Sequence, residues 1–158
     1  MDPFIAIYSD GSCDPLKKVG GWAAIIFQKN KKTIINGYAP GTTNQRMELT
    51  AIIRSLEAIQ TDDLSGVQIK IYSDSQYAIK LPARKDKLKA GSFLTKRGVP
   101  VRNADLLAVL IKYIESMNIE FIKVKAHQKT ASSPDFSREA DMLSRKIMRK
   151  HLLSLGSE

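Results

Sequence analysis

The chain has 158 residues, 43% of them hydrophobic and 26% charged, a length and balance typical of one globular domain with a sizeable core. Its 25 lysines and arginines against 16 acids give a net charge of +9, which favours a polyanionic partner, either nucleic acid or an anionic membrane surface. Its single cysteine, Cys13, excludes an internal disulfide, and no apolar run is long enough to span a membrane. Because the N-terminus also lacks the pattern of a signal peptide, we expect a cytoplasmic protein.

The N-terminal part of the chain predicts three successive strands. Residues 4–8 form a continuous apolar run typical of a strand buried on both faces, and this run leads into Ser9-Asp10-Gly11. Residues 20–27 and 33–39 predict two further strands, with a polar turn over residues 29–32 between them. The three strands are therefore expected to form an antiparallel meander.

A helix is predicted between the meander and a fourth strand. Apolar residues recur at helical spacing over residues 44–60, and Thr42 with Gln45 has the spacing of a capping box. Alternating apolar residues over residues 67–73 predict the fourth strand. Because a helix separates the first and fourth strands, we expect these two strands to pair in parallel.

The second half of the chain predicts helices around one more strand. The expected elements are a short helix over residues 75–81 that ends at Pro82, an apolar helix over 104–117, a strand over 119–124 and a last helix over 137–153. This order predicts an α/β fold with a five-stranded mixed sheet flanked by helices. We expect residues 1–158 to form a single domain.

Residues 83–103 carry most of the excess positive charge. Seven basic residues stand there against Asp86 alone, a net +6 of the total of +9. Such a segment is either a solvated loop or a basic protrusion that binds phosphates, and its charge density favours the protrusion, with a steep salt dependence. The candidate phosphate contacts are Lys85, Lys87, Lys89, Lys96 and Arg97.

Four acids at the ends of predicted elements are candidate metal ligands. The tripeptide Tyr-Ser-Asp closes both the first and the fourth strand, so parallel pairing would bring Asp10 and Asp74 together at the carboxyl edge of the sheet. Glu48 and Asp141 are expected in the first turns of the first and last helices. Each acid alone would also suit a turn or a helix N-terminus. Together they predict a metal site, and oxygen ligands point to Mg²⁺ or Mn²⁺ rather than zinc.

Several blocks of sequence surround these acids. They are Asp10-Gly11-Ser12-Cys13, Gly20-Gly21-Trp22-Ala23-Ala24, Thr42-Thr43-Asn44-Gln45-Arg46-Met47-Glu48-Leu49, Tyr72-Ser73-Asp74-Ser75-Gln76-Tyr77, Val124-Lys125-Ala126-His127 and Ala140-Asp141. In this order they resemble the type 1 ribonuclease H family, a pattern that retroviral and retrotransposon ribonuclease H domains share. The resemblance spans nearly the whole chain and implies a ribonuclease H-like fold.

The resemblance implies an endonuclease that hydrolyses the RNA strand of RNA/DNA hybrids and leaves 5′-phosphate and 3′-hydroxyl ends. It implies that Asp10, Glu48, Asp74 and Asp141 hold two Mg²⁺ ions, with Mn²⁺ as a substitute, for a two-metal displacement. His127 would assist turnover by proton transfer, or by helping product and metal to leave.

The resemblance also implies how the substrate is recognised. Cys13, Asn44 and Gln76 would line the minor groove and read the 2′-hydroxyl groups that distinguish RNA from DNA. Thr43 lies in the same block, and Gln45 stands where many relatives have a second asparagine. The expected partner is an RNA/DNA hybrid, with no obligatory protein partner, and the expected state is a monomer.

Two alternatives to this function stay open. One is a catalytically silent hybrid-binding module with the same fold, and the other is a DNA-directed nuclease of the wider fold. The four acids argue against the binding module, because a binder has no need to concentrate negative charge beside phosphates. The block around Asn44 and the Ser75-Gln76 pair after Asp74 favour RNA over DNA.

Overall fold

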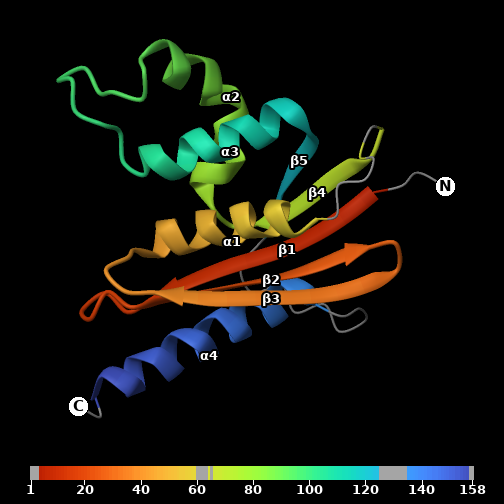
Figure 1. Cartoon of the computed structure of the whole chain (residues 1–158), viewed down its shortest axis with the longest axis vertical. Coiled ribbons are helices and arrows are strands. Elements are labelled where there is room, and N and C mark those ends of the chain that lie inside the picture. Colours follow the sequence, from red (N-terminus) through yellow and green to blue (C-terminus); the bar gives the residue numbers. More distant parts are fainter. Residues whose placement is uncertain (1–3, 60–63, 65, 125–134, 157–158) are drawn as a thin grey trace.

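The computed structural model describes residues 4–59, 64, 66–124 and 135–156 (Figure 1). Over these residues it forms five strands and four helices. In chain order they are β1 (Phe4–Cys13), β2 (Gly20–Gln28), β3 (Lys31–Ala39), α1 (Asn44–Ala58), β4 (Gln68–Ser73), α2 (Gln76–Ala90), α3 (Ala104–Ser116), β5 (Asn118–Lys123) and α4 (Phe136–Gly156). No helix in this part of the chain is long and apolar enough to cross a bilayer.

The five strands form one sheet in the order β3-β2-β1-β4-β5. β1 pairs antiparallel with β2 and parallel with β4, so the predicted mixed sheet with a helical crossover is confirmed. α1, α2 and α3 lie on one side of the sheet and α4 covers the other side (Figure 1). The C-terminal end of β4 and the middle of β1 carry residues of the site, and both therefore lie between α1 and α4.

The main core lies between the sheet and the helices α1 and α3. Ile7 and Ile71 on neighbouring strands are fully buried there, against Leu49 and Ile52 of α1 and Leu110 of α3. Burial of each such side chain contributes roughly 1.5–3 kcal/mol to the stability of the fold. This packing fixes α1 on the sheet and with it the position of the residues at the N-terminal end of α1.

β1 is longer than the sequence predicts. Its parallel ladder with β4 ends at the pair Tyr8 and Tyr72, whereas its antiparallel ladder with β2 continues to Cys13. Asp10 therefore lies inside β1 and not at its end, because hydrogen bonds to β2 keep the backbone extended. The divergence of β4 from β1 after Tyr8 leaves space beside Asp10 for other groups.

The prediction that Pro82 ends a short helix is wrong. α2 runs from Gln76 to Ala90 with Pro82 inside it, so residues 83–90 of the basic segment are helical. Proline removes one intrahelical hydrogen bond because it has no N–H group. Leu81 and Leu88 are both buried in the core, and their packing on either side of Pro82 holds the helix together.

The ends of three other elements differ slightly from prediction. Thr43, not Thr42, caps α1, since its hydroxyl accepts a hydrogen bond from the backbone N–H of Arg46 at 3.2 Å. Glu48 consequently lies in the second turn of α1, and Asp141 in the second turn of α4, which begins at Phe136. The turn between β2 and β3 is only two residues long, because two successive residues with positive φ make a tight hairpin.

Candidate active site

Three carboxylates meet where β1 and β4 separate. Asp10 comes from β1, Asp74 follows the last residue of β4, and Glu48 comes from α1. One carboxylate oxygen of each residue lies within 4.8 Å of those of the other two. This separation allows a single cation to contact all three side chains.

Asp141 lines the same cleft from the opposite side of the sheet. It belongs to α4, and its Oδ1 atom accepts a hydrogen bond from Nε of Arg145, one turn further along the helix, at 2.9 Å. The structure thus brings the four predicted acids around one cleft. Three of them form a tight group, and Asp141 is paired with an arginine.

Gly11 explains how α1 comes so close to β1. A Cβ atom at position 11 would lie 2.5 Å from the carbonyl carbon of Met47 and 2.7 Å from its Cβ atom. Real Cβ atoms essentially never approach other atoms this closely. The glycine therefore lets the backbone of α1 rest on β1, and this contact places Glu48 beside Asp10.

The pKa values of two carboxyl groups reflect this crowding. Burial, followed by the charge of Asp74, raises the pKa of Asp10 to about 8, although the backbone N–H of Gly11 donates a hydrogen bond to it at 2.8 Å. Burial and Asp74 also raise the pKa of Glu48 to about 7, against a hydrogen bond with Ser75 that lowers it. Crowded carboxylates are relieved either by protons or by bound cations. An all-oxygen group of this kind fits a hard divalent cation.

The cleft around the acids has a volume of about 260 Å³. Of the substrate-binding residues predicted from the sequence, Asn44 lines it, and its amide donates a hydrogen bond to Oε1 of Glu48 at 3.0 Å. Several other residues that line the cleft had no predicted role. These are Gly11, Ser12, Arg145, Met148 and Arg149. The spacing of four residues between Asp141, Arg145 and Arg149 is a signal that could have revealed the two arginines.

The other predicted substrate-binding residues of these sequence blocks are all among the described residues, but they do not line the cleft. Cys13 ends β1, and its thiol donates weak hydrogen bonds to the carbonyls of Asp14 and Thr42 at 3.5 Å. Burial raises the pKa of the Cys13 thiol, which keeps it protonated at neutral pH. Thr43 caps α1, Gln45 is half-buried in its first turn, and Gln76 is exposed at the start of α2.

His127, the predicted assistant in turnover, lies outside the described residues. No geometry therefore relates it to the carboxylates, and its role stays a prediction.

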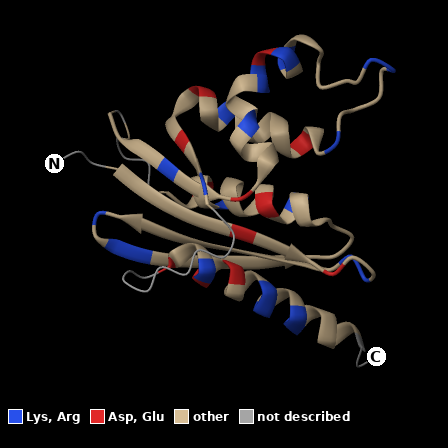
Figure 2. Ribbon diagram, turned by 180° about the vertical axis from the view of Figure 1, so that it is seen from behind, with Lys and Arg blue, Asp and Glu red and all other residues tan. Residues whose placement is uncertain are grey.

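The five candidate phosphate contacts of residues 83–103 divide into two groups. Lys89 forms an ion pair with Glu115 of α3 at 2.9 Å, and Lys85 lies 3.8 Å from the same carboxylate and 3.2 Å from Asp86. Lys87, Lys96 and Arg97 are exposed and form no ion pair with another described residue. Figure 2 shows the basic residues of α2 and its following loop on one side of the molecule and those of α4 on the other.

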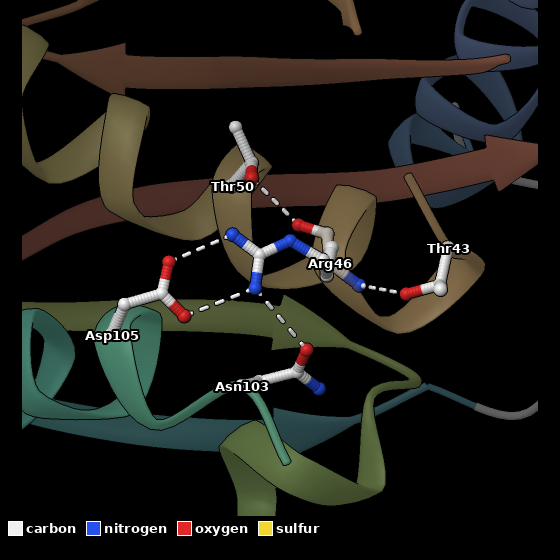
Figure 3. A network of polar contacts seen from close by, with 5 residues as sticks. All are labelled: Thr43, Arg46, Thr50, Asn103 and Asp105. Atoms are coloured by element: carbon white, nitrogen blue, oxygen red, sulfur yellow. Dashed lines mark hydrogen bonds and ion pairs between the residues drawn. The ribbon is translucent and has the colours of Figure 1, made fainter. Parts of the chain in front are cut away.

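A polar network joins the start of α1 to the start of α3 (Figure 3). The guanidinium of Arg46 donates two hydrogen bonds to the carboxylate of Asp105, at 3.0 and 2.8 Å, and a longer one to Asn103 at 3.4 Å. The hydroxyl of Thr50 donates to the carbonyl of Arg46 at 2.6 Å. Arg46 thereby ties the helix that carries Asn44 and Glu48 to the end of the basic segment.

Comparison with known proteins decides the family. Residues 2–149 match the family model described as RNase H. The chain belongs to the ribonuclease H family. The ribonuclease H of Prosthecochloris aestuarii is 37% identical over 150 residues, which cover 93% of this chain and 97% of that protein. The ribonuclease H of Caldanaerobacter subterraneus subsp. tengcongensis is 33% identical over 150 residues, 94% of this chain and 93% of the relative.

Solved structures agree with this ribonuclease H assignment at the level of the fold. LC9-RNase H1, a type 1 RNase H with the type 2 active-site motif, superimposes with a TM-score of 0.78 at 20% identity, covering 95% of this chain and 74% of that one. A foamy viral protease-reverse transcriptase in complex with dsDNA gives a TM-score of 0.67 at 14% identity over 93% and 94% of the two chains. The predicted family and fold class are thus confirmed, and membership makes the chain a metal-dependent nuclease.

Proposed function

We propose that this chain hydrolyses the RNA strand of RNA/DNA hybrids at the cleft around Asp10, Glu48, Asp74 and Asp141, leaving 5′-phosphate and 3′-hydroxyl ends. The observation that carries the proposal is the group of three carboxylates whose oxygens lie within 4.8 Å of one another, in a chain of the ribonuclease H family. The curated relatives bear the name of this activity.

The oxygen ligands of the cleft would hold two divalent cations, for which Mg²⁺ is our choice and Mn²⁺ the substitute. Asp10, Glu48 and Asp74 would hold them from one side and Asp141 from the other. When bound, such ions activate a water molecule and stabilise the negative charge that develops on the leaving 3′-oxygen.

The protein side chains would prepare the site in three ways. Asp10 and Glu48 would release their protons on binding a cation, because a nearby positive charge lowers the pKa of a carboxyl group. The hydrogen bond from Asn44 to Oε1 of Glu48 would hold that carboxylate at the cleft. The hydrogen bond from Nε of Arg145 to Oδ1 of Asp141 would orient that carboxylate at the cleft.

For substrate recognition, we retain the residues that the resemblance implies. Asn44 lines the cleft. Together with Cys13, Thr43, Gln45 and Gln76, it would face the minor groove and its 2′-hydroxyl groups. His127 would assist turnover, and the basic segment 83–103 would hold phosphates outside the cleft. We also propose that the chain acts as one domain and as a monomer.

The first experiment is cleavage of one end-labelled strand presented in four forms: RNA/DNA, RNA/RNA, DNA/DNA and single-stranded RNA, with Mg²⁺ and with EDTA. We expect cleavage of only the RNA in the hybrid, and only with metal. Equal cleavage of duplex DNA would replace the proposal with a DNA-directed nuclease. Tight hybrid binding without any cleavage would replace it with a binding module.

A matched pair of variants on α1 tests the metal role. Glu48→Gln removes a ligand charge from the cleft, so we expect the cleavage rate to fall about a thousandfold or more, since metal ions contribute several kcal/mol and each 1.36 kcal/mol is a tenfold change. Glu57→Gln, on the same helix but paired with Arg54 away from the cleft, should leave the rate unchanged. Mg²⁺-dependent cleavage by Glu48→Gln at the wild-type rate would contradict the assignment of this ligand.

A further inference from the structure

The C-terminal part of α4 is a basic surface next to the cleft. After Asp141 the helix carries Arg145, Lys146, Arg149 and Lys150 and no further acid before Gly156. The two arginines line the cleft together with the carboxylates, whereas the two lysines do not. Figure 2 shows this run of basic residues along α4, on the side of the molecule away from α2 and the loop that follows it.

The two arginines differ in what they bind within the protein. Asp141, Arg145 and Arg149 are spaced four residues apart and therefore share one face of the helix. Arg145 donates to Asp141, a side chain of the site itself. Arg149 is exposed and forms no ion pair with another described residue, although it lines the same cleft. Its charge is thus left for a group that enters the cleft from solution.

The position of Arg149 is set by tight packing of the helix on the sheet. A Cβ atom at Gly21 of β2 would lie 2.7 Å from the backbone nitrogen of Met148 and 3.2 Å from Cβ of Ile147. The turn that precedes Arg149 therefore rests directly on the strand that pairs with Asp10. Because the backbone of this turn is already held in place, binding at the cleft costs less conformational entropy for the Arg149 side chain than for a side chain on a free loop.

The helix dipole does not explain this arginine. Cations are favoured in the last turn of a helix by the partial negative charge of its C-terminus, and the effect fades beyond that turn. α4 ends at Gly156, so Arg149 lies well before its last turn.

We propose that Arg149 binds a backbone phosphate of the nucleic-acid substrate on the α4 side of the cleft; this rests on the function proposed above. Arg149 lies eight residues, about 12 Å along the helix axis, from Asp141. The phosphate that Arg149 meets is therefore a neighbour of the cleaved one, on the side of the substrate that faces α4. The planar guanidinium with several N–H donors suits a phosphodiester. This contact is separate from those of residues 83–103, which belong to α2 and its following loop.

Arg149→Gln and Lys150→Gln are a matched pair that tests the proposal. Both remove one positive charge from neighbouring exposed positions of the same helix, but only Arg149 lines the cleft. On a long hybrid we expect Arg149→Gln to raise KM about five- to tenfold with kcat unchanged, as loss of one charge-assisted contact to substrate requires. Lys150→Gln should change KM less than about twofold. Equal effects of the two variants would show a general effect of charge and would overturn the proposal.

Hybrids shortened on one side of the cleaved bond locate the contact. As the duplex on the side that reaches α4 is shortened stepwise towards the cleaved bond, the KM values of wild type and Arg149→Gln should become equal, while shortening on the other side should preserve their difference. A difference that persists when the α4 side is shortened would overturn the proposal. Binding of the long hybrid, followed by fluorescence anisotropy in EDTA, compares the same variants without cleavage. Failure of wild type to cleave the hybrid would count against the proposed function, whereas equal binding by the two variants would count against Arg149 alone.

Discussion

At the scale of single residues, the carboxyl groups of the cleft hold protons that a metal ion would replace. In the folded protein without metal, Asp10 keeps its proton up to a pH of about 8, whereas the unfolded chain releases it near the ordinary value of 3.8. Between these values the unfolded state binds fewer protons, so the free energy of unfolding falls as the pH rises. The loss is complete once the pH passes the folded-state pKa.

This difference predicts how Asp10→Asn changes stability. Asparagine cannot ionise, so in EDTA the variant should melt higher than wild type, and the gap should widen by several degrees between pH 5 and pH 8. Mg²⁺ should raise the melting temperature of wild type at pH 8 and affect the variant less, because it binds the folded state through these ligands. Differential scanning calorimetry measures both effects. Asp86→Asn, which removes an exposed carboxylate outside the cleft, is the control, and a gap for Asp10→Asn that does not vary with pH would contradict the pKa assigned to Asp10.

From the sequence, some of these residues could be predicted to meet at the cleft, but others could not. The repeated Tyr-Ser-Asp tripeptide predicts that Asp10 and Asp74 meet, because parallel strands place equivalent ends at one edge of the sheet. The contribution of Arg149 to the cleft was not predicted, since it depends on the rotation of α4 about its axis. That rotation is set by the close contact of the helix with Gly21, which no local pattern reveals.

At the scale of elements, the contact of β1 with α1 through Gly11 sets the geometry of the site. Gly11→Ala would force a methyl group into the backbone of Met47 and Glu48. We expect it to lower the free energy of unfolding by about 1–3 kcal/mol, as overpacking typically does, and to weaken Mg²⁺ binding by moving α1 away from Asp10. Urea denaturation and calorimetric titration of the metal measure the two effects.

Gly91→Ala is the matched control for this substitution. A Cβ atom at position 91 meets nothing closer than 3.5 Å, and the residue has a negative φ of −86°. It should therefore leave stability and metal binding nearly unchanged. Wild-type stability in Gly11→Ala would show that the two elements can separate without cost.

The Arg46 network fixes a second junction between elements. Asp105→Asn removes the carboxylate that accepts two hydrogen bonds from the guanidinium of Arg46. We expect the free energy of unfolding to fall by about 1 kcal/mol. This is the upper end of the range for an exposed ion pair, because the contact is bidentate. Glu57→Gln, which breaks the single contact with Arg54 on the same helix, should cost less than about half as much. Urea denaturation of both variants and wild type tests the ranking, and an equal loss in the two would contradict it.

Elements were predicted well where one local pattern dominated and wrongly where distant packing opposed it. The strands and α1 follow from hydrophobic periodicity alone. Pro82 is a strong local stop signal, yet α2 continues through it because Leu81 and Leu88 are buried on the same core. β1 likewise continues past its apolar run because β2 supplies partners as far as Cys13.

At the scale of the whole molecule, positive charge lies on two surfaces with the acidic cleft between them. The net charge of +9 predicted a polyanionic partner and could be assigned in advance to residues 83–103, but not to α4. Family membership was also predictable, because the blocks around the acids are specific in content and order. The distribution of charge around the cleft depends on which side chains are already paired within the protein, and this requires the structure.

Ion pairs within the protein determine which basic residues of segment 83–103 are available to bind substrate phosphates. Lys85 and Lys89 share Glu115, so part of their charge is neutralised before substrate arrives, whereas Lys87, Lys96 and Arg97 have no such partner among the described residues. We therefore expect the combined variant Lys87→Gln, Lys96→Gln and Arg97→Gln to raise KM more than the variant Lys85→Gln with Lys89→Gln. Each lost phosphate contact lowers the slope of log K against log salt by about 0.9, so the triple variant should flatten it by up to roughly 2.7.

Hybrid binding measured by anisotropy at several salt concentrations, in EDTA to prevent cleavage, gives these slopes directly. The change in slope is divided by the number of charges removed, because one variant loses three charges and the other loses two. If the segment is a protrusion that binds phosphates, the slope per charge is larger for the unpaired set. An unchanged slope in both variants would mean that residues 83–103 are a solvated surface, and that the salt dependence of binding comes from α4 and the residues around the cleft.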